Sequence, residues 1–136
     1  MAYAVSRAQT VLSFEAAATL SAYRIVKPTT ANHVGLWDTS TAQIIGVTLD
    51  DSTGGSDSSV AIVIAGTAKV ACGASVSTGA LVCAQTATGL LIETGAIPTT
   101  ATSTFPKMLG IALQSGSTNS VIEVLLQIDN HNKVAW

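Results

Sequence analysis

The sequence contains few charged residues. They account for 10% of its 136 residues, against roughly 25% in an average soluble domain. Hydrophobic residues reach 48%, a normal share, so Ser, Thr and Ala take the place of the missing charges. An isolated soluble domain carries about 25–35% charged residues on its surface. We therefore expect contacts with other molecules to cover much of this exterior.

The charged residues do not form clusters of one sign. The formal net charge is −2 at pH 7, and no basic cluster is available for phosphates or anionic lipids, which argues against nucleic-acid and membrane-surface partners. No apolar run approaches the roughly 20 residues of a membrane span. The first residues, Met1 to Arg7, lack the charged and apolar regions of a secretory signal. We expect a single-domain, soluble protein that is not exported.

Residues suited to catalysis or metal binding are scarce. The two cysteines, Cys72 and Cys83, are too few for a structural zinc site. They could face each other across a hairpin, as a disulfide or, more simply, as free buried thiols. His33 and His131 lie in Asn-flanked loops without a sequence neighbour that would mark a base or a ligand. Phosphate-binding, dinucleotide-binding, zinc-protease and nucleophile-elbow motifs are absent. We expect no enzyme activity, no metal and no cofactor.

The acidic loop from Asp50 to Asp57 superficially resembles a calcium site. An EF-hand loop needs a bidentate Glu at its twelfth position, where this sequence has Ala61. A polar hairpin loop is the simpler interpretation. A looser site for a divalent cation remains an alternative.

From Leu20 onward, short apolar runs alternate with turn residues, a pattern typical of an all-β sandwich or barrel. The run from Val60 to Ile64 is rich in β-branched residues and shows no polar alternation, which predicts a strand buried on both faces. Gly66 is expected to end that strand. The expected strands cover residues 20–27, 34–38, 42–49, 60–64, 69–72, 79–83, 89–94, 108–113 and 121–126.

One motif occurs twice. The stretch Ile44 to Leu49 returns as Met108 to Leu113, and each copy is followed by a polar loop and a second apolar run. Weaker counterparts match residues 35–39 with 89–94 and residues 20–27 with 76–83. The pattern indicates either an internal duplication or chance similarity in a chain dominated by Ala, Gly, Thr, Val and Leu.

The central glycines of the two copies, Gly46 and Gly110, need a physical reason. Glycine in the interior of a strand weakens the strand and often marks a bulge or a close approach of another backbone. A small barrel also has to bend its strands sharply, and glycine permits such a bend. We expect both glycines to lie where their strands bend.

Residues 1–19 show neither helical nor strand periodicity, although residues 15–18 could form a helical turn. Apolar side chains in this stretch would be poorly placed in water, so we predict an arm that lies along a neighbouring surface. A frayed terminus or an edge strand is the alternative. The predicted organisation is an arm (1–19), a β-barrel domain (20–128) and a C-terminal tail (129–136).

The two tryptophans receive different interpretations. Trp37 is predicted to lie in the core, whereas Trp136 at the end of the tail needs a surface to bury against, as aromatic anchors of interfaces do. The residues predicted to contact a neighbouring molecule or another subunit are Tyr3, Val5, Arg7, Val11, Leu12, Phe14 and Trp136.

The order of glycines and apolar positions resembles a known family. The series comprises Ala18 to Lys27, Gly35-Leu36, Ile45-Gly46-Val47, a strand ending in Gly66, and Gly110 to Leu113. It is similar to the small β-rich head-decoration (capsid cement) proteins of tailed bacteriophages, over most of residues 18–128. The matching positions are glycines and apolar residues and include no chemical motif.

This resemblance implies a small β-barrel or β-tulip-like domain of short antiparallel strands. Such a protein adds to the outside of a completed phage head and bridges neighbouring major capsid proteins, often as a trimer, with an N-terminal arm as a clamp. Residues 1–19 match that arm in position and character. The leading hypothesis is therefore a capsid decoration protein on the head exterior, made in the host cytoplasm. A receptor- or glycan-binding module of a virion fibre or a cell surface, reading through loops 50–59 and 95–106, is the alternative.

Overall fold

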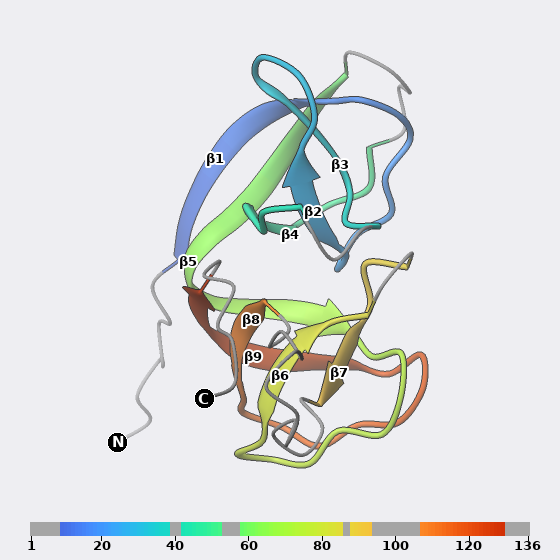
Figure 1. Ribbon diagram of the computed structural model, residues 1–136, viewed down its shortest axis with the longest axis vertical. Helices are drawn as coiled ribbons and strands as arrows, with labels where there is room; N and C mark the ends of the chain where they lie inside the picture. The colour runs from blue at the N-terminus through green and yellow to red at the C-terminus, as the bar shows by residue number, and fades with distance from the viewer. Residues whose placement is uncertain (1–8, 39–41, 53–57, 86–87, 94–106, 130–136) are drawn as a thin grey trace, which may run out of the picture.

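A computed structural model shows that the chain is all-β, as the sequence predicts (Figure 1). The structure describes residues 9–38, 42–52, 58–85, 88–93 and 107–129. Within these ranges every regular element is a strand. The strands are β1 (Gln9–Ala16), β2 (Ile25–Pro28), β3 (His33–Leu36), β4 (Gly46–Thr48), β5 (Ser59–Ala71), β6 (Leu81–Ala84), β7 (Leu91–Glu93), β8 (Met108–Ala112) and β9 (Val121–Asp129).

The strands form two units, one above the other in Figure 1, and the long strand β5 runs through both. In the first, β3, β2, β4 and β5 pair in that order, and β1 pairs with both β3 and β5. The pairings therefore close into a ring. We call β1 to β4 with the part of β5 before Gly66 unit 1.

The second ring uses the remainder of β5. Residues Thr67–Ala71 pair with β9, and the order continues through β8 and β6 to β7. A parallel bridge between Cys72 and Leu91 brings β7 back to the end of β5. We call this part of β5, with Cys72 and β6 to β9, unit 2. Gly66, with φ of 88°, lies where β5 passes from one unit to the other.

The two units repeat the same pairing pattern. Of the two alternatives that the sequence left open, internal duplication and chance similarity, the fold supports duplication. In unit 1, β2 pairs with β3 and β4, and β4 pairs with β5. In unit 2, β6 pairs with β7 and β8, and β8 pairs with β9. The second half of β5 takes the place that β1 has in unit 1, because each pairs antiparallel with the last strand of its unit.

Backbone details repeat as well. The Tyr23 N–H donates to the Thr48 carbonyl at 2.9 Å, and the Gly79 N–H donates to the Ala112 carbonyl at 2.7 Å. Tyr23 and Gly79 both have positive φ, 64° and 85°. A matching conformation at a tyrosine and a glycine, which differ strongly in their preference for positive φ, shows that the repeated fold fixes this turn.

Gly46 and Gly110 occupy equivalent positions in β4 and β8. A Cβ atom on Gly46 would overlap the carbonyl oxygen of Val63, and one on Gly110 would overlap that of Leu125. The close backbone approach expected from the sequence is thus confirmed at both sites. Of the two glycines, only Gly110 lies beside a bulge, which falls between Met108 and Gly110.

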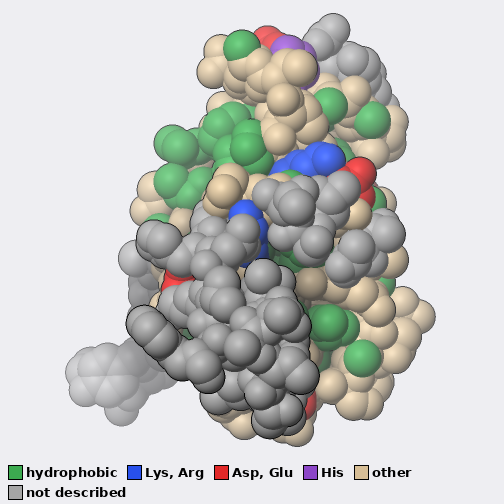
Figure 2. All heavy atoms as spheres, in the orientation of Figure 1, with side chains coloured by type: hydrophobic (Ala, Val, Ile, Leu, Met, Phe, Trp, Pro, Cys, Tyr) green, Lys and Arg blue, Asp and Glu red, His purple; other side chains and the backbone are tan. Residues whose placement is uncertain are grey.

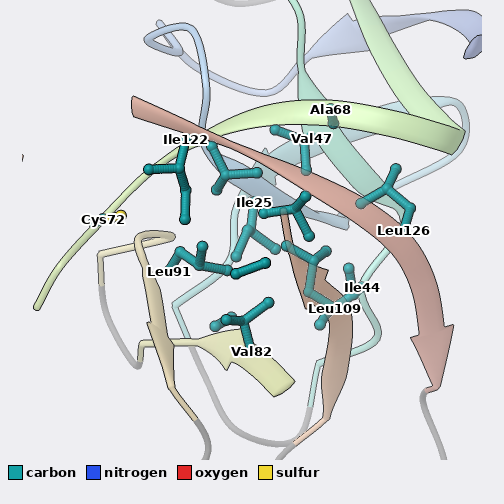
Figure 3. Packing of buried hydrophobic residues seen from close by; sticks show 14 of the residues in the cluster. Ile25, Ile44, Val47, Ala68, Cys72, Val82, Leu91, Leu109, Ile122 and Leu126 are labelled. Atoms are coloured by element: carbon teal, nitrogen blue, oxygen red, sulfur yellow. The ribbon is translucent and has the colours of Figure 1, made fainter. Parts of the chain in front are cut away.

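Equivalent positions also build the two cores. Each unit points one row of apolar side chains from alternating strand positions into its ring. In unit 1 these are Leu20, Val26, Val34, Val60 and Ile62, and in unit 2 they are Val76, Val82, Leu91, Ile122 and Val124. The unit 2 cluster extends to side chains of unit 1, among them Ile25, Ile44 and Val47, so the two units share one packed interface (Figure 3).

Several sequence expectations require correction. The strand at 60–64 does not end at Gly66, because β5 continues to Ala71. The sheet begins at Gln9, before the domain start predicted at Leu20, and residues 15 and 16 belong to β1 instead of a helical turn. The ladders are not all antiparallel, since β1 and β3 pair in parallel.

The alignment of the weaker repeat also changes. Gly35 pairs with Lys27 of β2, and Ile92 pairs with the equivalent residue of β6, Cys83. Gly35 therefore corresponds to Ile92 and not to Gly89. Gly89 instead corresponds to Asn32, and both have φ of 62°. Sequence similarity misaligned this segment because glycine and asparagine both tolerate that conformation.

Candidate interaction surface

The described residues contain no group of three or more His, Cys, Asp or Glu side chains placed to hold a metal ion. They also include no helix with the length and hydropathy needed to cross a membrane.

The first half of β1 exposes large apolar side chains. Val11 is 40% exposed and Leu12 is 46% exposed, and successive residues of a strand point to opposite faces, so the strand is uncovered on both sides. Figure 2 shows hydrophobic side chains gathered over this side of unit 1. Exposed apolar clusters of this kind mark interaction sites.

The second half of β1 anchors the strand. Phe14 is partly buried against the core of unit 1, and Ala16 is fully buried within it. Cross-strand pairing places Phe14 beside Val60 of β5. Phe14, which the sequence predicts as a contact residue, thus serves mainly to hold β1 on the ring, while Val11 and Leu12 remain available for contacts.

The other predicted contact residues, Tyr3, Val5, Arg7 and Trp136, lie outside the described residues. Trp37 is buried, and its Nε1 donates to the Ala42 carbonyl at 3.1 Å. Its predicted place in the core is confirmed, and the hydrogen bond satisfies the indole N–H that burial removes from water.

Charged groups near these surfaces are arranged as local pairs. The Lys27 ammonium lies 2.5 Å from Asp38 Oδ1, and His33 Nε2 lies 3.1 Å from Glu15 Oε2. Lys69 and Glu123 are directly opposite each other across β5 and β9. Each of these pairs places an acidic side chain beside a basic one, so these residues form no single-sign patch that would select a highly charged partner.

A cleft of about 280 Å³ is lined by residues of both units. Its lining includes both polar and apolar side chains: Gln9, Tyr23, Thr48, Leu49, Asp50, Val63, Ala68, Lys69 and Glu123. The charged groups of the lining are Asp50, Lys69 and Glu123, and Lys69 lies directly opposite Glu123 across β5 and β9.

The two cysteines are free and buried. They do not face each other, because Cys83 lies opposite Ile92 and Met108 while Cys72 lies opposite Leu91. Burial raises the pKa of Cys83 to about 11 and also raises the pKa of Cys72. Both thiols therefore stay protonated at neutral pH and behave as small hydrophobic groups.

The acidic loop lies only partly within the described residues. Asp51 Oδ1 accepts a hydrogen bond from the Ala22 N–H at 2.6 Å, and Asp50 lines the cleft between the units. Residues 53–57, with Asp57, lie outside the described part. Asp50 thus faces the cleft, whereas the Asp51 carboxylate accepts the hydrogen bond of the turn at Ala22.

A second exposed apolar surface was missed by the sequence analysis. Leu81 of β6 is directly opposite Ile111 of β8, which is directly opposite Leu125 of β9. Leu81 is 54% exposed, and the other two are partly exposed. We call these three residues the outer row. The sequence contains no signal for this surface, because its exposure depends on how the two units pack.

The fold defines an all-β protein made of two equivalent strand rings in tandem. No protein-family model matches the chain, and no curated protein matches its sequence. Among solved structures, it is similar to the head fiber gp8.5 N base of bacteriophage phi29, with a TM-score of 0.63 and 14% sequence identity. The match covers 88% of this chain and 95% of that chain. It therefore spans both units, and at this identity it establishes a shared fold.

Proposed function

We propose that this protein is a structural component of a phage head that binds the outer surface of the assembled shell. The observation that carries the proposal is the fold, which matches a head-fibre base over nearly the whole of both chains. The low charge content and the exposed apolar strand β1 support it, because both are features of a protein whose exterior is partly covered in an assembly.

In this proposal the mechanism is binding, and the protein is not an enzyme. Val11 and Leu12 of β1 contact neighbouring major capsid proteins and bridge them. A protein that binds only the assembled shell shifts the assembly equilibrium towards the shell. The role of a decoration protein and the role of a fibre base share this attachment and differ in whether a further structure extends outward from it.

The test is co-sedimentation with phage heads that lack the protein, combined with the melting temperature of those heads. We expect binding at micromolar concentration and a higher melting temperature of the bound shell. Val11→Glu should weaken binding about tenfold or more, because it places a charge in an apolar contact. Val121→Glu is the matched control, since Val121 has a similar exposure of 42% and lies on β9 in unit 2.

Absence of binding by the wild-type chain, or equal binding by the Val11 and Val121 variants, would overturn the attachment through β1. An image of the decorated head then separates the two roles: a decoration protein gives a compact feature on the shell, and a fibre base gives a protruding one. Binding to a glycan array instead would favour the receptor-binding alternative, which uses loops 50–59 and 95–106. Residues 53–57 of the first loop and all of the second lie outside the described residues.

A further inference from the structure

Tyr23, which lines the cleft between the units, has a backbone conformation that tyrosine rarely adopts. Its φ is 64°, whereas the equivalent position of unit 2 carries Gly79 with φ of 85°. The other described non-glycine residues with positive φ are Asn32 and Asn119, and asparagine tolerates this region far better than tyrosine does. Strained positions of this kind gather at ligand-binding and active sites. The Tyr23 side chain is therefore the first indication of a site in the cleft.

The charged pair of the cleft is also specific to one unit. Strand pairing makes Ser13 the counterpart of Lys69 and Ala61 the counterpart of Glu123. Ser13 and Ala61 pair with each other across β1 and β5, as Lys69 and Glu123 do across β5 and β9. Either pair of residues supports the same strand pairing, so the fold does not require the charges. Features that one copy adds to a shared scaffold indicate function more than folding.

Hydrogen bonds on both sides hold Tyr23 in place. Its N–H donates to the Thr48 carbonyl at 2.9 Å, and its carbonyl accepts from the Ala71 N–H at 3.0 Å. The buried Thr48 hydroxyl donates to the Ser21 carbonyl at 2.7 Å and accepts from the Arg24 N–H at 2.9 Å. The turn that carries Tyr23 is thus fixed before any ligand arrives, and such preorganisation lowers the cost of binding.

The size and the chemistry of the cleft restrict its ligand. Its volume of about 280 Å³ lies just below the range of about 300–1,000 Å³ for pockets of drug-sized molecules, so a single six-membered ring is a suitable size. The carboxylates of Asp50 and Glu123 outnumber the ammonium of Lys69, which disfavours an anion. Carboxylates accept hydrogen bonds and an ammonium donates them, and a ligand hydroxyl satisfies both. The aromatic face of Tyr23 adds an apolar contact.

We propose that the cleft binds one ring of a saccharide. The Tyr23 ring packs against the C–H groups of the sugar, and Lys69 donates a hydrogen bond to one of its hydroxyls. Asp50 and Glu123 accept hydrogen bonds from other hydroxyls. The sugar is a free monosaccharide or the terminal residue of a longer glycan, which share this chemistry. This binding goes beyond attachment to a phage head and does not depend on it.

NMR titration of the isolated, ¹⁵N-labelled full chain tests the inference. The probes are D-glucose, D-galactose, D-mannose and N-acetyl-D-glucosamine, and at least one of them should shift the amide signals of Tyr23, Thr48 and Lys69 in a saturable way. Immobilised glycans that end in the same sugars then identify the source: their capture of the chain indicates a glycan terminus, and binding of the free sugar alone indicates a monosaccharide. No capsid is present, so failure of this test is distinct from failure to bind heads.

Variants that copy the other unit locate the binding. Tyr23→Gly should weaken sugar binding by about tenfold or more, while circular dichroism shows an intact fold, because glycine suits the positive φ. Lys69→Ser, at an exposed position, should weaken binding without touching the Tyr23 turn. Gln127→Ala is the control, since Gln127 lies on β9 outside the lining, and it should bind like the wild type.

Two results overturn the inference. One is a wild-type chain that shows no saturable shift with any of the four sugars. The other is wild-type affinity in both Tyr23→Gly and Lys69→Ser, because the sugar then binds outside the cleft.

Discussion

In unit 1 the Ile25 side chain has no exposed surface, whereas Leu81, at the same position of unit 2, is 54% exposed. The two residues have similar size, the same place in their strands and equivalent cross-strand neighbours, Val47 and Ile111. The difference comes from packing between units, because unit 2 covers the row that contains Ile25. The comparison shows that an identical local pattern acquires a core or a surface role from what lies next to it.

A second contrast lies between β1 and the second half of β5, which have the same role in their rings. Ala68 and Val70 of β5 are buried, whereas Leu12 at the position of Ala68 is 46% exposed and Phe14 at the position of Val70 is only partly buried. The end of unit 2 near Ala68 packs against unit 1. Among the described residues, no second unit packs against the corresponding end of unit 1.

The largest expected effect concerns Ile25 and Leu81. Ile25→Ala should lower the free energy of unfolding by about 3 kcal/mol, because it removes buried methyl and methylene groups and leaves a cavity. Leu81→Ala should change it by less than about 0.5 kcal/mol in dilute protein, where its surface faces water. Urea denaturation measures both variants. Equal losses in the free energy of unfolding at the two positions would show that Ile25 and Leu81 are equally covered, which would contradict this comparison.

A somewhat smaller effect tests where the units are alike. Gly46→Ala and Gly110→Ala should each cost about 2–3 kcal/mol, because the added Cβ overlaps a carbonyl oxygen of the adjacent strand in both units. Gly79→Ala is the control: no atom lies within 4 Å of its added Cβ, but φ is +85°, so it should cost only about 1 kcal/mol. If Gly46→Ala or Gly110→Ala costs no more than this control, the close approach at that strand is not rigid.

The smallest effect concerns a position where the units differ chemically. Cys83 in unit 2 corresponds to Lys27 in unit 1, whose ammonium pairs with Asp38. Burial raises the pKa of Cys83 from 9.0 to about 11, so the folded state holds its proton where the unfolded state loses it. This contribution is fully present below pH 9 and disappears as the pH rises towards 11, amounting to roughly 2 kcal/mol.

Urea denaturation at several pH values between 8 and 11 checks this contribution. The variant Cys83→Ala should lose less stability over this range than the wild type, because it no longer carries the buried thiol. Parallel curves for the two proteins would show that Cys83 is not protected in the folded state. Alkylation of the native chain at neutral pH should likewise be slow until the chain unfolds.

The sequence alone predicted the strands from Leu20 onward, although it did not predict β1. Short apolar runs separated by turn residues, and a glycine that recurs at Gly46 and Gly110, are local signals with local causes: period-two side-chain direction and a backbone contact that excludes a Cβ. Val11 and Leu12, which the sequence predicts as contact residues, are exposed on β1. Phe14 was placed in an arm without strand periodicity, and both its strand β1 and its partly buried position became apparent only in the ring.

The remainder depended on long-range pairing, which a single sequence does not display. Gly66 ends a strand by local rules, yet β5 continues through it because both flanks find partners in different units. The parallel pairing of β1 with β3, which closes unit 1, joins segments whose own residues give no sign of it. The outer row could not be predicted for the same reason. Its residues are as apolar as those of the equivalent buried row, and only the packing of one unit on the other determines that Ile25 is covered while Leu81 is exposed.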